Sequence, residues 1–158
     1  MPLIFSSGWG GVEISSRHHS TYIKEPMKYT EDTWPVEKWP NFTFKEIACQ
    51  HTGECDINPD FMDKVQKLRV LVDEPLVITS GYRSPDHPIE AKKSTVGAHA
   101  QGKAIDVQCM GSKAHKILAA AMALGFSGIG VSQSGDYKTR FLHLDTVDSD
   151  IRPGVWSY

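Results

Sequence analysis

The sequence predicts a single compact domain of the α+β class, with a mostly antiparallel sheet and helices packed on one of its faces. The chain has 158 residues, a length typical of one domain with one hydrophobic core. Two segments carry apolar residues at helical spacing, and several shorter ones alternate or are rich in β-branched residues, as strands do. Short connections separate these segments and no internal repeat is visible, which favours one α+β unit.

Residues 1–40 differ from the rest and are expected to form an irregular N-terminal arm. They are rich in Ser, Thr, Pro and Trp, show no sustained periodicity and contain several prolines that break regular structure. Trp34 and Trp39 are expected to attach this arm to the domain proper, which we assign to residues 41–158. A short ordered element is expected to begin the domain, in the segment NFTFKEIACQ.

Two helices follow from periodicity and end signals. Asn58 can cap a helix and Pro59 suits its first turn, and the apolar pattern continues to about Asp73. The apolar stripe of this helix consists of Phe61, Val65, Leu68 and Val72. A second helix is expected over Ser112–Leu124, with Ser112 as its cap and Gly125 at its C-terminal end.

Four segments read as strands. PLVITSGYRS is rich in β-branched residues and runs into a glycine turn, after which residues 84–98 form a polar loop. The segments AIDVQC, SGIGVS and RFLHLD are further strands of the same sheet. The tail RPGVWSY is left without an assigned element.

Composition excludes several classes of protein. The net charge of −2 gives no basic footprint for nucleic-acid binding, and no apolar run is long enough to span a membrane. The first residues, MPLIFSSGWGG, lack the basic region and the apolar length of a secretory signal, so synthesis in the cytoplasm is expected. Three cysteines do not form a disulfide framework.

The alternation of side chains gives the sheet two different faces. In AIDVQC the aliphatic residues point one way and Asp106 the other, and in RFLHLD the leucines oppose His143 and Asp145. In SGIGVS the second face carries only Gly128 and Gly130. One face is therefore aliphatic, and the other has the composition of a cleft floor.

His99 lies seven residues before Asp106, at the entry to the same strand. Two imidazoles and one carboxylate, His99, Asp106 and His143, would make a three-ligand Zn²⁺ site with an open fourth position. The ion would also supply the positive charge that lets Asp106 stay ionised on a desolvated face. From spacing alone, a capping histidine and a surface ion pair remain an alternative.

The motifs SGYRSP, HAQGKAID and FLHLD occur in an order that resembles the M15 zinc peptidases, the family of D-Ala-D-Ala carboxypeptidases and endolysins. The similarity covers roughly residues 42–156. It implies a hedgehog/DD-peptidase-like fold, one zinc per chain, and His99, Asp106 and His143 as the ligands. It also implies that Arg83 of SGYR binds a substrate carboxylate or polarises the scissile carbonyl, for which a guanidinium fork is suited.

Two positions depart from the family pattern. Many members have serine two residues before the first ligand, where this chain has Gly97. Many also carry an acidic general base three residues before the last ligand, where this chain has Arg140. Asp145 shares a strand face with His143 and is our candidate for the base; orienting a ligand histidine is the alternative.

Further residues are candidates for contact with substrate: Tyr82, His87 and Trp156. The segment CQHTGEC offers Cys49, His51 and Cys55, for which a structural metal site, a disulfide and simple loop packing are all open.

The resemblance implies a peptidase that hydrolyses an amide bond in peptidoglycan stem peptides, in the manner of a phage endolysin released to the wall by a holin. A monomer that binds neither nucleic acid nor membrane is expected. The alternative is a non-catalytic, metal-stabilised module that binds the wall or another protein on the same fold.

Overall fold

The computed structural model describes residues 24–158 and confirms an α+β fold. The elements follow one another as β1 (Met27–Tyr29), α1 (Phe44–Ile47), β2 (Cys55–Ile57), α2 (Pro59–Val72), β3 (Val77–Ser80), β4 (Ala104–Gln108), α3 (Gly111–Ala123), β5 (Gly128–Ser132), the 3₁₀ turn η1 (Tyr137–Thr139), β6 (Phe141–Asp145) and β7 (Gly154–Ser157). In these residues, no helix is long and apolar enough to cross a membrane.

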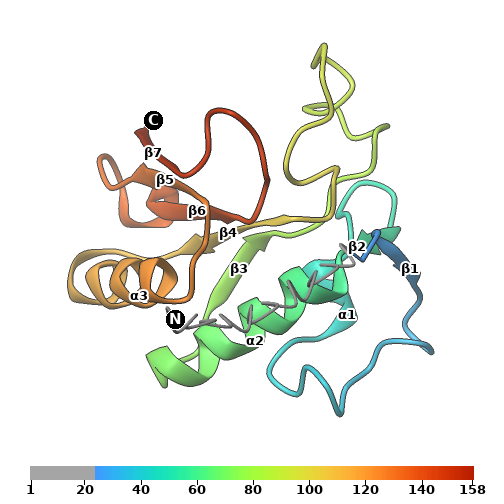
Figure 1. Ribbon diagram of the computed structural model, residues 1–158, viewed down its shortest axis with the longest axis horizontal. Coiled ribbons are helices and arrows are strands. Elements are labelled where there is room, and N and C mark those ends of the chain that lie inside the picture. The colour runs from blue at the N-terminus through green and yellow to red at the C-terminus, as the bar shows by residue number, and fades with distance from the viewer. Residues whose placement is uncertain (1–23) are drawn as a thin grey trace, which may run out of the picture.

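The main sheet has five strands in the order β3-β4-β6-β5-β7 (Figure 1). Every neighbouring pair is antiparallel except β5 and β7, which run parallel. The strands β1 and β2 form a separate antiparallel pair. The sheet is therefore mostly antiparallel, as the sequence predicts.

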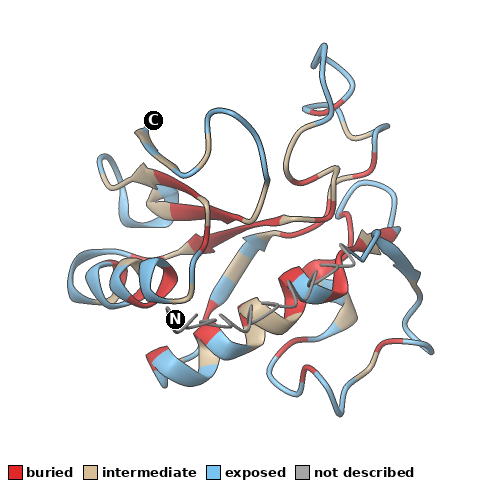
Figure 2. Cartoon of the chain, viewed as in Figure 1, coloured by how far each residue is buried: buried red, intermediate tan, exposed pale blue. Residues whose placement is uncertain are grey.

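The helices α2 and α3 cover one face of the main sheet, and the loop of residues 84–98 rises on the opposite side (Figure 1). The strands β4 and β6 are buried along most of their length, while both helices expose their outer surfaces (Figure 2). The aliphatic face of the sheet joins the helices in one core; its members include Ile105, Val107, Ile129, Leu142 and Leu144. The predicted division between an aliphatic and a polar face is confirmed.

The helix ends test the predicted caps. Asn58 caps α2, since its side-chain oxygen accepts a hydrogen bond from the Phe61 N–H at 3.0 Å, and Pro59 opens the helix. The predicted cap of the second helix is wrong. Met110 occupies the N-cap position of α3 without a side-chain hydrogen bond, and Ser112 already lies inside the first turn. Gly125 follows this helix with a positive φ of 74°, as expected of a residue after a helix end.

Two tryptophans of the expected arm are part of the core. Trp34 and Trp39 are buried and pack on each other with ring centroids 4.9 Å apart, and Tyr29 contacts both rings. The segment is not irregular throughout, because β1 pairs with β2. Residues 1–23 of the expected arm lie outside the described residues, and the boundary at residue 40 stays a prediction.

The strand β7 is missing from the sequence-based assignment. It is short, follows a proline and exposes Val155, so neither length nor alternation of apolar residues reveals it. Its backbone pairs with β5 in the register Gly130 to Trp156, which places Trp156 beside the polar face of the sheet.

Candidate metal centre and active site

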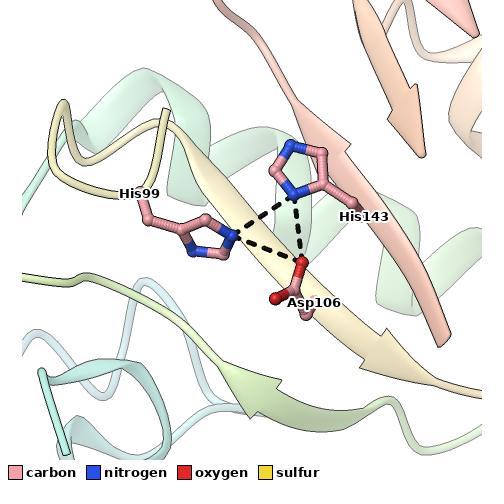
Figure 3. A group of neighbouring side chains, drawn as sticks. All are labelled: His99, Asp106 and His143. Carbon is pink, nitrogen blue, oxygen red and sulfur yellow. Dashed lines mark hydrogen bonds and ion pairs between the residues drawn. The ribbon is translucent and has the colours of Figure 1, made fainter. Parts of the chain in front are cut away.

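Three predicted ligands meet on the polar face of the sheet. His99 comes from the turn before β4, Asp106 from β4 and His143 from β6 (Figure 3). All three are buried, and one donor atom from each lies within 4.8 Å of the others. In the described part of the chain this is the one group of three or more His, Cys, Asp or Glu side chains arranged in this way.

Backbone pairing places these residues together. Asp106 and His143 are direct partners in the β4–β6 register, so their side chains project side by side. His99 reaches them through a tight turn in which Gly102 has a φ of 66°. A Cβ atom on Gly102 would lie 2.3 Å from the Asp56 carbonyl oxygen, so only glycine fits where this turn packs against β2.

In each histidine, the ring nitrogen that faces away from the other two residues has a hydrogen-bond acceptor. His99 Nδ1 lies 2.7 Å from the Gly81 carbonyl oxygen, and His143 Nε2 lies 3.0 Å from Asp145 Oδ2. Both acceptors require a proton on the histidine, which leaves the inward nitrogen of a neutral ring with its lone pair. Histidines that bind metals are commonly held by such a partner on the second nitrogen.

Three electron pairs therefore converge when both rings are neutral. The distances are 3.2 Å from His99 Nε2 to His143 Nδ1, 3.3 Å from His99 Nε2 to Asp106 Oδ1 and 3.0 Å from His143 Nδ1 to Asp106 Oδ1. Ligand atoms on a tetrahedral zinc with bonds of about 2.0–2.1 Å are about 3.3 Å apart. The donor set and its spacing fit one zinc ion, and some cation is needed to offset their repulsion.

In the metal-free protein, a proton supplies the positive charge that offsets the repulsion among the three converging atoms. Burial disfavours the charged form of His143, but hydrogen bonds to Asp106 and Asp145 outweigh it and raise the pKa of this histidine. Burial likewise opposes ionisation of Asp106, yet hydrogen bonds from His143 and His99 hold its pKa well below the usual value. The site is thus built to hold positive charge.

Arg83 adjoins the same centre on the side of β3. Its Nη2 donates to Asp106 Oδ2 at 2.9 Å and its Nε to Ser80 Oγ at 2.9 Å. The two oxygens of Asp106 are thereby divided, one facing Arg83 and the other facing the histidines. Arg83 also lines a pocket of about 200 Å³ with Gln50, Thr79, Ser80, Gly81, Tyr82, His87 and Ile89.

The family model described as Peptidase M15 matches residues 40–145, a stretch that contains Arg83 and all three converging residues. The chain belongs to the peptidase M15 family. M15 peptidases are zinc metallopeptidases, and the His-Asp-His group of this member is able to bind a metal ion. A comparison with curated protein sequences finds no significant match.

In this M15 peptidase, Asp145 lies on the far edge of the His143 ring from the converging atoms. Its side chain is fully buried and bonded to His143 Nε2, to the Val147 N–H at 3.1 Å and to Arg152 at 2.8 and 3.2 Å. Burial opposes its ionisation, but the bonds from His143 and Arg152 outweigh this and lower its pKa to about 2. This geometry favours the orienting role over the role of general base.

Trp156 covers the centre from the β7 side. Its ring lies 5.2 Å from the His143 ring, and the Arg152 guanidinium stacks 4.6 Å from the indole. A Cβ atom on Gly130 would lie 2.8 Å from both Trp156 and Tyr158, so both aromatic rings lean over the bare glycine of β5. The sequence analysis includes Trp156 but misses Arg152 and Tyr158. Tyr158 lies two residues after Trp156 and so shares its side of the chain, whereas no local pattern indicates Arg152.

The other two substrate-contact candidates differ in accessibility. Tyr82 is only 4 % exposed and packs in the hydrophobic core, where burial raises its pKa to about 12. His87 is half-buried, lines the pocket beside Arg83 and contacts the ring of His51 at 5.9 Å. Both assignments stay predictions, and the position of His87 supports its assignment better.

The cysteine segment forms neither a disulfide nor a metal site in the structure. Cys49 and Cys55 are buried free thiols, and His51 is exposed beside His87. Of the three alternatives, loop packing is the one that the structure supports. Burial raises the pKa of the Cys55 thiol to about 12, so this side chain behaves as an apolar group.

Proposed function

We propose that the protein is a zinc-dependent peptidase that hydrolyses an amide bond in peptidoglycan stem peptides. The observation that carries the proposal is the convergence of His99 Nε2, Asp106 Oδ1 and His143 Nδ1, with the proton-bearing nitrogens of both histidines turned away. Membership of the M15 family supports the peptidase class and the choice of zinc. From the family resemblance, we further propose that the protein is a phage endolysin that acts at the bacterial wall.

Each residue of the centre has a distinct part in this proposal. His99, Asp106 and His143 hold the ion, which when bound acidifies a water molecule and polarises the scissile carbonyl. Asp145 and the Gly81 carbonyl fix the orientations of the two rings. Arg83 keeps N–H groups free beside the pocket, where they can donate to the carbonyl or a carboxylate of the substrate.

A non-catalytic, metal-stabilised binding module remains a second candidate. The observation in its favour is that Asp145, the base candidate from the sequence, is fully buried and already accepts bonds from His143, Val147 and Arg152. Such a module would bind peptidoglycan or a protein without turnover.

Digestion of purified peptidoglycan with zinc-loaded protein, followed by mass spectrometry of the fragments, separates the two candidates. We expect new free termini within the stem peptides, and their masses identify the bond that is cut. Chelated protein and the His143→Ala variant serve as inactive controls. Stoichiometric zinc without any release of fragments would favour the binding module.

The stabilisation by zinc is expected to increase with pH. In the zinc-free protein the raised pKa of His143 means that its proton stabilises the fold below the unfolded pKa, and that this stability is lost as pH rises through the folded pKa. Zinc replaces the proton. The difference in Tm between zinc-loaded and zinc-free protein should therefore grow as the pH rises from the ordinary pKa of histidine, about 6.5, through the raised pKa of His143. A difference independent of pH would contradict this protonation scheme.

Arg83→Lys is expected to lower kcat/KM by about 10- to 100-fold while zinc content stays at one per chain. Lysine keeps the charge but carries its three donors on one nitrogen, so it cannot span Ser80, Asp106 and a substrate oxygen as the separate nitrogens of the guanidinium do. Peptide hydrolysis and metal analysis of the same preparation check this. Wild-type kinetics would show that Arg83 has only a structural part.

A further inference from the structure

Glu90 is a buried carboxylate that the proposed mechanism does not use. Its side chain is only 3 % exposed, although it lies in the loop of residues 84–98. A buried carboxylate without a partner is strongly unfavourable, so its neighbours indicate why it is there. Lys93 Nζ donates to Glu90 Oε1 at 2.8 Å, and Arg83 Nη1 lies 3.5 Å from the same oxygen.

Glu90 completes a set of three contacts around one guanidinium. Ser80 accepts from Nε, Asp106 accepts from Nη2, and Glu90 faces Nη1. Each nitrogen of Arg83 thus has a different partner. Because Nη1 faces Glu90, Arg83 contacts Asp106 through Nη2 alone, and Asp106 Oδ1 stays turned toward the histidines.

The backbone around Gly97 is adapted to this ion pair. A Cβ atom at Gly97 would lie 2.5 Å from Lys93 Nζ and 2.6 Å from Glu90 Oε2. Gly97 is the position at which many family members have serine. In this chain the space is occupied by the Glu90–Lys93 pair, between Arg83 and the segment that carries His99.

We infer that Glu90 is a positioning residue that fixes the Arg83 guanidinium toward the pocket lined by Gln50 and His87. This inference rests on the proposed peptidase function. Loss of the Glu90 carboxylate frees Nη1, so that the guanidinium can rotate about its contact with Asp106 Oδ2 and withdraw from the substrate, while Asp106 Oδ1 and the two histidines remain in place. Glu90 therefore acts on turnover only through Arg83.

A double-mutant cycle with Glu90→Gln and Arg83→Met tests the inference. Glu90→Gln alone is expected to lower kcat/KM by about 10- to 100-fold with zinc content unchanged. In the Arg83→Met background the same change is expected to have no further effect, because its target is gone. Glu74→Gln, which removes a partly exposed glutamate paired with Lys116, is the matched control for loss of charge.

The outcomes separate this inference from the proposed function. Zinc-dependent cleavage by the wild type in the same assay establishes the function, whatever the variants do. Multiplicative losses in the double mutant, or wild-type kinetics of Glu90→Gln, would overturn the positioning role. Should Glu90→Gln fail to fold, Gly97→Ser displaces the same pair from the other side. It is expected to lower kcat/KM in the wild type but not in the Arg83→Met background.

Discussion

Replacing His143 with alanine is expected to yield a folded protein without bound zinc and without peptidase activity above that of the chelated wild type. The same result is expected for His99→Ala and Asp106→Ala, because each supplies one of three converging donor atoms. Two remaining ligands hold zinc far less tightly than three. Metal analysis after gel filtration and peptidoglycan cleavage measure both effects.

The control for these variants is His115→Ala, which removes an exposed histidine from α3. It should keep one zinc per chain and full activity. Stoichiometric zinc in all three ligand variants would show that the ion binds elsewhere. The assignment of His99, Asp106 and His143 would then have to be abandoned.

Asp145→Asn is expected to weaken zinc binding by about 10- to 100-fold, the usual effect of losing the partner of a ligand histidine. Because the deficit is in affinity, excess zinc should restore much of the activity. A general base would behave in the opposite way, with full zinc content, a loss of about 10²- to 10⁴-fold in rate and no rescue by zinc. Zinc titration followed by activity at each concentration distinguishes the two roles.

Asp145→Ala should in addition destabilise the protein by about 1–3 kcal/mol, since it leaves the half-buried guanidinium of Arg152 without its partner. Asp148→Asn changes an exposed carboxylate in the same segment and should leave both zinc affinity and stability unchanged. Urea denaturation of the zinc-free variants measures the stability difference. Equal stabilities of Asp145→Ala and the wild type would mean that Arg152 finds another partner.

The parts of the fold that follow from local physics could be predicted. Asn58 and Pro59 mark the start of α2 because a cap and a fixed φ act within one turn. The faces of β4 and β6 follow from alternation because one side of the sheet is buried in the aliphatic core. Asp106 and His143 follow from the same alternation, whereas His99 lies in a turn and is indicated by its position before Asp106 and by the family motifs.

The parts that depend on loop conformation could not be predicted. Arg152 meets Asp145, and Glu90 meets Arg83, through irregular segments that have no period to indicate which residues touch. The strand β7 was not predicted because its pairing with β5 depends on backbone contacts and not on an apolar pattern. The start of α3 was also predicted wrongly, at Ser112, because Met110 occupies the N-cap position and its side chain makes no capping hydrogen bond that a sequence pattern could indicate.

The direct pairing of Asp106 with His143 has a consequence for the exchange of the ion. Where a metal alone holds distant parts of a chain together, its binding closes a large loop, and removal of the metal unfolds the protein. Here the β4–β6 hydrogen bonds already hold two of the ligands side by side, and the turn at Gly102 holds the third. Zinc should therefore enter and leave a preformed cradle within a folded domain, and a chelated sample should regain activity on addition of zinc without a refolding step.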